Sequence, residues 1–367
     1  MSLLQRIKEQ YEKFPYPSIS LLAKAKAADC HLINYEAGMA ASFGSCKRAV
    51  MRPKILIAGC GTFEPYIVAL ANPNAEITAL DFSSRALKKL RWRMRLRCPG
   101  RKIKYICSSI EALSENLGKF DMIVATGILH HLENPTYGLK KLASFLEVDG
   151  VFRVMLYSKH GRSNIYKIRD LARALSISTG SELRAAINLL PNDHPLRIHF
   201  YLYADIRSEA GIRDGFLNVI DAPMDALQCE KFLSDANLEA TYFIHSPSGQ
   251  PSRFDELYAG ERTTMRVWEK IAALDRISEL ESNFIFWARS KGMIMKNMPA
   301  NNFNTYKVNP ALRGIRARTV FSKLLGEKIL ITPKLKKLLR KEIIKREDLN
   351  IKELTRLTQA LWLLPLE

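Results

Sequence analysis

A strand that runs directly into a glycine turn constrains the fold of this chain more than any other feature. Residues 54–58 (KILIA) form an apolar run of strand length, and Gly59 and Gly61 follow at once. Apolar residues at helical spacing resume at Ile67. Glycine has no Cβ, so it lets the backbone turn sharply and pass close to a ligand. The order of strand, glycine turn and helix predicts the ligand-binding edge of a Rossmann-like sheet.

Apolar runs of the same kind recur along the chain and alternate with helical patterns. We expect further strands at residues 76–80, 103–107, 120–125, 151–157, 239–245 and 283–289. Strands that alternate with helices form parallel, doubly wound sheets. The expected fold class is α/β, with a doubly wound, mostly parallel sheet of seven strands.

The patterns divide the chain into three parts. Residues 1–50 are expected to form an N-terminal cap or lid, and residues 51–294 the sheet domain. Helical patterns at about 158–215 and 253–281 interrupt the sheet domain as insertions. Residues 295–367 are rich in Lys and Arg and are expected to form a small, basic, helical C-terminal domain.

Asp81 stands at the end of the second predicted strand, twenty residues after Gly61. A carboxylate at this place can accept hydrogen bonds from both hydroxyls of an adenosine ribose. A full dinucleotide fingerprint has a third glycine three positions after the second, but Glu64 stands there. An acidic residue there argues against a pyrophosphate on the helix end, and so against a nicotinamide oxidoreductase.

Four segments of the chain follow one another in a characteristic order. They are residues 55–62 (ILIAGCGT), 79–83 (ALDFS), 109–113 (SIEAL) and 121–132 (DMIVATGILHHL). In order and spacing they resemble the successive motifs of class I S-adenosylmethionine-dependent methyltransferases. The resemblance covers about 52–157 well and, more loosely, 10–17 and 190–238, which are similar to bacterial methyltransferases of largely unassigned substrate.

The resemblance implies a set of residues that bind the cofactor S-adenosylmethionine. They are Gly59, Cys60, Gly61, Asp81, Phe82, Ser109, Ile110, Thr126 and Gly127. By the same resemblance, Gly59 and Gly61 would pass beneath the methionine part of the cofactor, and Asp81 would hold the ribose. Ser109 and Ile110 would flank the adenine. The implied reaction is transfer of a methyl group to an O or N nucleophile. This displacement requires the nucleophile, the methyl carbon and the sulfur to be aligned in a cavity that excludes water.

His130 and His131 are the candidate catalytic residues, because they follow the fourth strand on the side where the resemblance places the methyl group. An unperturbed histidine pKa near 6.5 suits proton removal at neutral pH. The alternative is that two adjacent histidines pack or cap a helix start. Tyr11 and Tyr16 present the same choice between covering the cofactor and local packing. The other histidines do not show the spacing of metal ligands, so no metal site is expected.

The chain is strongly basic, with 56 Lys and Arg against 37 Asp and Glu and a formal charge of +19. This excess creates a positive field that attracts anionic partners. Basic residues gather between Phe82 and Ile110 and again at residues 334–341. Either stretch could bind RNA, an acidic protein or a membrane surface. The alternatives are a solvated basic face for the first stretch, and for the second a helix whose leucines pack against Leu361 and Leu363.

The sequence has no apolar run of about 20 residues that could span a bilayer. The first residues carry acidic side chains where a signal peptide is apolar, so a cytoplasmic location is expected. The cysteines are scattered without a CxxC pair, and we expect reduced, buried thiols.

The methyl acceptor is left open between several classes. A small metabolite is favoured, because helical insertions after the fifth strand often enclose a pocket, and a protein lysine or an RNA are alternatives. The motifs of DNA amino methylation (Asn-Pro-Pro-aromatic) and of 5-methylcytosine formation (Pro-Cys) are absent after the fourth strand. A function of another class is a non-catalytic binding or regulatory protein. The shape of the pocket would discriminate, since an aromatic channel favours a lysine side chain and a basic groove favours RNA.

Overall fold

The computed structural model describes residues 3–257, 264–280, 282–293 and 303–366. Its central feature is a seven-stranded sheet in the order β3-β2-β1-β4-β5-β7-β6. The strands are β1 (Lys54–Ala58), β2 (Glu76–Asp81), β3 (Ile103–Cys107), β4 (Phe120–Thr126), β5 (Leu146–Tyr157), β6 (Leu238–Phe243) and β7 (Asn283–Ser290). The first five run parallel, whereas β7 is antiparallel to both of its neighbours. The predicted mostly parallel α/β sheet is confirmed.

The strand order reverses between β1 and β4. From β1 the chain proceeds outward through β2 to β3, and it then returns to the other side of β1 to form β4 and β5. In open α/β sheets such a reversal leaves a crevice at the carboxyl ends of the two central strands, and ligands bind there. The glycine turn after β1 lies in this crevice.

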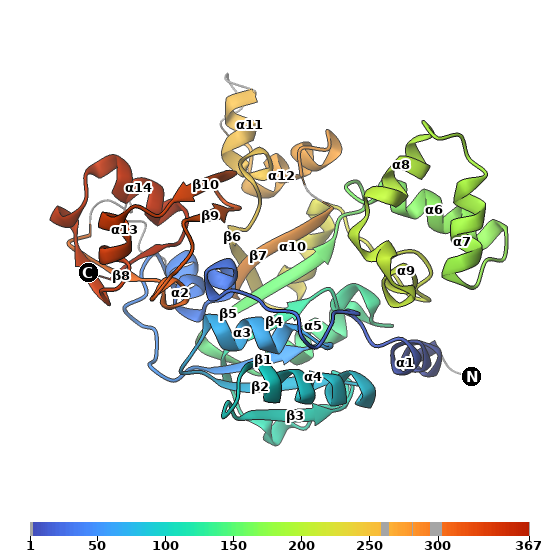
Figure 1. The fold of residues 1–367 in the computed structure, drawn as a ribbon, viewed down its shortest axis with the longest axis horizontal. Helices are drawn as coiled ribbons and strands as arrows, with labels where there is room; N and C mark the ends of the chain where they lie inside the picture. Colours follow the sequence, from blue (N-terminus) through green and yellow to red (C-terminus); the bar gives the residue numbers. More distant parts are fainter. Residues whose placement is uncertain (1–2, 258–263, 281, 294–302, 367) are drawn as a thin grey trace.

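Helices cover both faces of the sheet (Figure 1). They are α2 (Tyr35–Phe43), α3 (Glu64–Ala71) and α4 (Ser84–Arg97) on one face, and α5 (Pro135–Ala143), α10 (Ala226–Asp235) and α12 (Val267–Arg276) on the other. Successive residues of a strand point to opposite faces. Accordingly Ile55 packs in the apolar core beneath α2–α4, and Leu56 packs in the core beneath α5, α10 and α12. Both side chains are fully buried, as parallel strands covered on both faces require.

Only the first part of the N-terminal segment is a cap. Helix α1 (Leu3–Lys13) crosses the carboxyl edge of the sheet, where Glu12 accepts hydrogen bonds from the backbone N–H groups of Ser84 and Arg85 at the start of α4. By contrast α2 is part of the main core: Met39 is fully buried, and a Cβ on Gly38 would come within 2.6 Å of Trp287 in β7. The segment that lies over the site, residues 3–20, is called the cap below and is shorter than the expected residues 1–50.

The insertion after β5 is helical, as predicted. It comprises α6 (Ser163–Ala174), α7 (Gly180–Asn188), α8 (Pro195–Leu202) and α9 (Glu209–Phe216). These helices have an apolar core of their own, which includes Ile168, Ile187, Phe200 and Phe216. Figure 1 shows them as a lobe on the same side of the molecule as α1. Of the second insertion, α11 (Pro251–Leu257) and α12 are described and are helical as well.

The C-terminal unit corrects the expectation of a purely helical domain. It contains β8 (Thr305–Val308), β9 (Thr319–Ser322), β10 (Glu327–Leu330), α13 (Pro333–Leu338), β11 (Ile343–Lys345), α14 (Ile351–Gln359) and β12 (Leu363–Pro365). β11 and β12 pair with β8, and β9 pairs with β10. Strands of three or four residues are too short for their alternation to stand out against the leucine spacing of the helices. The unit packs near α2, where Lys307 donates to Glu36, and it lies on the far side from α1 (Figure 1).

Many residues of the two basic stretches have structural roles. Leu335, Leu338 and Leu339 are buried in the core of the C-terminal unit together with Leu363, which confirms packing for that stretch. In the stretch on α4, Arg93 is fully buried. Its guanidinium donates to the carbonyl oxygens of Thr62, Ser20 and Ile19 at 2.9, 2.8 and 2.7 Å. In the described residues, no helix is both long and apolar enough to cross a membrane. Cys98 is half-buried and Cys107 exposed, so not every thiol is buried as expected.

Candidate active site

Two adjoining cavities lie in the crevice at the carboxyl edge of the sheet. Tyr11, Gly59, Asp81, Phe82 and Ile128 line both of them, so the two cavities form one continuous site. The first cavity extends toward the ends of β2 and β3, and the second toward the ends of β4 and β5. Together with the solvent at their mouths they enclose about 530 and 980 Å³.

The glycine turn is required by geometry at two positions. Gly59 and Gly61 have φ angles of +63° and +55°, in the left-handed region that side chains disfavour. A Cβ on Gly59 would lie 2.6 Å from the side chain of Ile128, and one on Gly61 would lie 2.6 Å from the carbonyl oxygen of Tyr16. The turn is therefore packed between the loop after β4 and the cap. Cys60 between them is buried, and its N–H donates to the carbonyl oxygen of Leu80 at 2.9 Å.

Asp81 ends β2 and points into both cavities. Its Oδ2 accepts the N–H of Gly61, and its Oδ1 accepts the N–H of Ser83, each at 2.8 Å. Burial beneath the cap raises the pKa of Asp81 to about 6. Each carboxylate oxygen has two lone pairs, so the group can still accept hydrogen bonds from a ligand. The ring of Phe82 lies 5.7 Å from the ring of Tyr11 and helps to close this part of the site.

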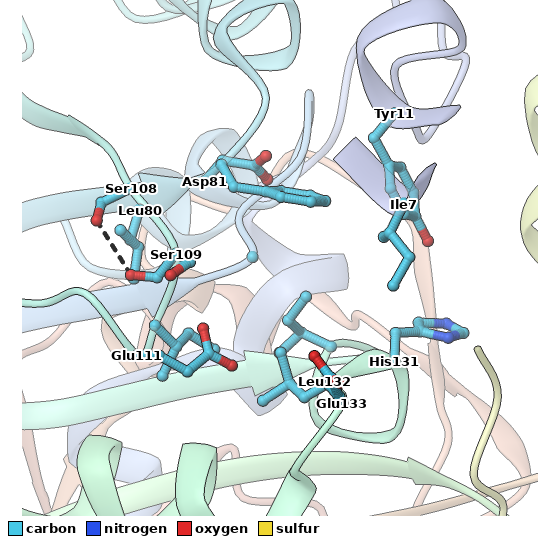
Figure 2. Close-up of a pocket in the computed structure, with 14 residues that line it drawn as sticks. Ile7, Tyr11, Leu80, Asp81, Ser108, Ser109, Glu111, His131, Leu132 and Glu133 are labelled. Atoms are coloured by element: carbon cyan, nitrogen blue, oxygen red, sulfur yellow. Dashed lines mark hydrogen bonds between the residues drawn. The ribbon is translucent and has the colours of Figure 1, made fainter. Parts of the chain in front are cut away.

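The first cavity is a largely apolar slot (Figure 2). Ile110, Ile128 and Leu132 line it, and Ile7 and Tyr11 reach over it from α1. Its polar lining residues include Asp81, Ser109 and Glu111. Ser109 and Ser108 lie at the end of β3, where the hydroxyl of Ser108 donates to the carbonyl oxygen of Ser109 at 3.1 Å. A slot of this kind suits a flat heteroaromatic ring with polar edges.

The second cavity has a polar floor at the ends of β4 and β5. Thr126 and Gly127 line it, and Arg153 on β5 donates to the hydroxyl of Thr126 at 3.1 Å. Glu64, at the start of α3, lies beside this pair and also lines the cavity. Burial raises the pKa of Glu64 to about 7. From the sequence, Glu64 served only as an argument against a pyrophosphate, and its place in the site was missed.

The structure separates the two candidate histidines. His131 lines the first cavity, and its Nδ1 lies 2.8 Å from the carbonyl oxygen of Ile220. His130 lines neither cavity, is fully buried and stacks on Tyr157 with 3.6 Å between the ring centroids. Burial lowers the pKa of both rings, so both are neutral at physiological pH. The geometry therefore gives His130 no access to a bound substrate, and a role as base remains a prediction for His131.

His130, His131 and Asp221 bring ligand atoms within 4.8 Å of one another. Asp221, however, forms a buried ion pair with Arg169 at 3.6 Å. Arg162 lies close enough to reinforce the lowered pKa of both histidines. Two guanidinium groups next to the cluster oppose the binding of a cation. The cluster therefore fits an internal ion pair better than a metal site.

A polar network joins the cap to the helical insertion above the second cavity. The hydroxyl of Tyr11 donates to Oδ1 of Asp214 on α9 at 2.6 Å and accepts from Asn218 at 2.9 Å. The hydroxyl of Tyr16 donates to Asp205 at 3.1 Å. Both tyrosines line the site, which agrees with the interpretation that they cover it and not with purely local packing. Asp214 lies within residues 190–238, where the resemblance is loose and marks no single residue, so the sequence did not single it out.

The geometry of sheet and site defines a class of protein. A seven-stranded sheet with this order, an antiparallel β7, a glycine turn after β1 and an acidic residue at the end of β2 are the features of the class I methyltransferase fold. Residues 56–152 match the family model described as "Methyltransferase domain". Residues 56–152 thus carry a methyltransferase domain, and the predicted fold is confirmed.

Two proteins show how far the similarity extends. An uncharacterized protein of Synechococcus sp. is 31% identical over 180 residues, which are 49% of this chain and 42% of that protein. The chain thus spans less than half the length of that relative. The structure of PKMT2 from Rickettsia typhi superimposes with a TM-score of 0.59 at 16% identity, over 78% of this chain and 59% of that one. In its complex with AdoHcy the TM-score is 0.57 at 16% identity, over 75% of this chain and 58% of that one. These structures share the fold.

Proposed function

We propose that the protein is an S-adenosylmethionine-dependent methyltransferase that transfers a methyl group to an N or O nucleophile. One observation carries the proposal. All nine residues that the motifs mark as cofactor-binding line the continuous site at the carboxyl edge of the sheet. They come from the ends of four different strands, so their convergence is a property of the fold and adds to the sequence pattern.

The residues present fit this cofactor part by part. Ile110, Ile128 and Leu132 form the apolar slot for the adenine, and Asp81 accepts the ribose hydroxyls. The turn at Gly59 leaves room for the methionine part, whose ammonium group Glu64 can neutralise. When bound, the cofactor supplies a methyl group on a positively charged sulfur. The protein in turn must align the acceptor and exclude water.

Exclusion of water is the task of the cap. Tyr11 and Tyr16 cover the second cavity, and their hydroxyls are tied to Asp214 and Asp205 of the insertion. Such a displacement needs no strong base if the acceptor reaches the site as a neutral nucleophile. An acceptor site enclosed between cap and insertion supports a small metabolite or a single side chain. A long polyanion such as RNA fits it less well.

Calorimetric titration with S-adenosylmethionine tests the proposal. We expect wild-type protein to bind the cofactor at micromolar concentration and Asp81→Asn to bind it at least tenfold more weakly, because a good hydrogen bond to a charged group contributes about 1.5–3 kcal/mol. Asp149→Asn, at a half-exposed carboxylate far from the site, should bind like wild type. Absence of binding to the wild type, or binding of NADH in its place, would refute the proposal.

A further inference from the structure

The second cavity is acidic, although the protein is strongly basic. The chain has a formal charge of +19. Yet Glu64, Asp81 and Asp214 line this cavity, and none of its lining residues in the described part of the chain is a Lys, Arg or His. The remaining lining is largely aromatic and aliphatic. Three carboxyl groups around one cavity favour a ligand group that carries, or can carry, a positive charge.

Two of the three carboxylates already have tasks under the proposed function. Asp81 holds the ribose, and Glu64 lies next to the methionine part. Asp214 remains, on the opposite wall, where it comes from α9 of the insertion. Its side chain is buried, with 4% of its surface exposed. One oxygen accepts from Tyr11 at 2.6 Å, and a carboxylate can accept about four hydrogen bonds. The hydroxyl of Tyr157 is a second hydrogen-bond partner, and the guanidinium groups of Arg162 and Arg169 lie within Coulombic range but do not line the cavity. The carboxylate therefore keeps capacity for one N–H donor on its cavity side.

Neighbouring side chains fix the position of Tyr157, which lies beside Asp214 in the wall of the cavity. The ring of Tyr157 has His130 at 3.6 Å and the guanidinium of Arg162 at 3.4 Å from its centroid. Two groups that close to one ring centroid must lie on opposite faces, so His130 and Arg162 clamp Tyr157 between them. Its hydroxyl interacts with Asp214. This explains the buried His130 without a catalytic step: it is a positioning residue for Tyr157.

We infer that Asp214, with Tyr11 and Tyr157 beside it, is the acceptor subsite for an aliphatic amine, so that the transfer is an N-methylation. This inference rests on the proposed methyltransferase function. A protonated amine is attracted by the carboxylate of Asp214, which can accept its N–H groups as charge-assisted hydrogen bonds. A hydroxyl acceptor, in contrast, would gain no such charge attraction, and among the described residues no histidine lines this cavity to take up its proton.

The reaction balances with the groups present. The ammonium form of the acceptor first gives up one proton to Asp214, which passes it to solvent. Asp214 can hold the proton transiently because burial raises its pKa to about 6. The positive sulfur of the cofactor favours this loss, because a nearby like charge lowers the pKa of an ammonium group. The nitrogen lone pair then forms the N–C bond, the C–S bond breaks, and its electron pair stays on sulfur as the neutral thioether.

A binding experiment with n-butylamine, the minimal mimic of an aliphatic amine, tests the inference on the full chain loaded with AdoHcy. We expect saturable binding of butylamine and none of butyrate or 1-butanol at the same concentration. Asp214→Asn should weaken amine binding at least tenfold and leave the affinity for AdoHcy within twofold of wild type. Asp193→Asn, an exposed carboxylate on the same insertion, should change neither.

The outcomes separate the two proposals. If the protein does not bind AdoHcy or S-adenosylmethionine, the methyltransferase function itself fails. If it binds the cofactor but not butylamine, or if Asp214→Asn leaves amine binding unchanged, the amine subsite is refuted and the methyltransferase function stands. Tyr11→Phe, which removes only the hydroxyl that donates to Asp214, serves as a second variant should Asp214→Asn not fold. Label transfer from methyl-labelled cofactor to free lysine or to a lysine-containing peptide then distinguishes a small amine from a protein side chain.

Discussion

At the scale of single residues, the site depends on close contacts that allow little variation. Gly61 touches the backbone of the cap, Gly59 touches Ile128, and Asp81 bonds the N–H of Gly61. The glycine turn therefore fixes the positions of the cap, the loop after β4 and the Asp81 carboxylate relative to one another. A change in any of these residues should affect cofactor affinity more than it affects the fold of the sheet.

Gly61→Ala tests this packing. Alanine at a positive φ costs roughly 1–2 kcal/mol by itself, and here the added Cβ would also press on the carbonyl oxygen of Tyr16 at 2.6 Å. We expect affinity for S-adenosylmethionine to fall at least tenfold, measured by calorimetry. Gly314→Ala is the matched control, since Gly314 has a φ of +71° but no atom of the described residues lies within 4 Å of the position that its Cβ would take. Equal affinity in the two variants would contradict the argument.

The protonation of Asp81 predicts how cofactor binding depends on pH. The pKa of Asp81 is about 6 in the fold and about 4 in an unfolded chain, so ionisation of this group lowers the stability of the fold as the pH rises from about 4 to 6. Binding has the opposite sign, because the ribose hydroxyls need the ionised carboxylate as acceptor. We expect affinity to increase as the pH rises through about 6 and then to level off.

Titrations between pH 5 and 8 check this prediction. Asp81→Asn should remove the step near pH 6. Glu64→Gln should leave that step in place and remove any further change near pH 7, where Glu64 titrates. A pH profile of Asp81→Asn identical in shape to that of wild type would show that another group is responsible.

At the scale of secondary structure elements, the cap is held by α4. Arg93 extends from α4 and satisfies three carbonyl oxygens, two of them in the cap and one next to the glycine turn. The planar fork of a guanidinium can make these bonds together, whereas a lysine ammonium cannot reach all three. The basic helix is thus in part an internal scaffold, and its charge alone is no measure of binding to an anionic partner.

Arg93→Lys should therefore destabilise the protein although it conserves the charge. We expect the free energy of unfolding in urea to decrease by about 1.5–3 kcal/mol, because buried carbonyl groups lose charged partners. Arg95→Lys on the exposed side of α4 should cost less than about 0.5 kcal/mol. A loss of similar size in both variants would mean that α4 contributes only general helix stability.

At the scale of the whole molecule, the candidate active site and the basic C-terminal unit lie in different places. The acidic, aromatic site lies between α1, the sheet edge and the α6–α9 lobe, and the basic C-terminal unit packs on the opposite side near α2 (Figure 1). The unit has an apolar core of its own around Trp362, which is fully buried. It should therefore influence stability without contributing to the cofactor site.

Trp362→Ala tests this separation. Removal of a fully buried indole costs about 3–5 kcal/mol, so thermal or urea unfolding should occur under milder conditions. Affinity for S-adenosylmethionine at 25 °C should stay within twofold of wild type. Leu330→Ala, at an exposed leucine of the same unit, controls for a general effect of mutation. A large loss of affinity in Trp362→Ala alone would show that the unit supports the site.

The sequence by itself determined the sheet and the part of the site that we propose binds the cofactor. Strand, glycine turn and helix are local patterns, and parallel strands bring their carboxyl ends to one edge, so Gly59, Asp81 and Thr126 could be placed together without coordinates. Only the tertiary structure showed the side of the site that we propose holds the acceptor. Asp214 lies 203 residues from the Tyr11 that it contacts, and no periodicity encodes such a pairing. The same holds for His130, whose place depends on the ring of Tyr157, and for the short strands of the C-terminal unit, which long-range pairing alone defines.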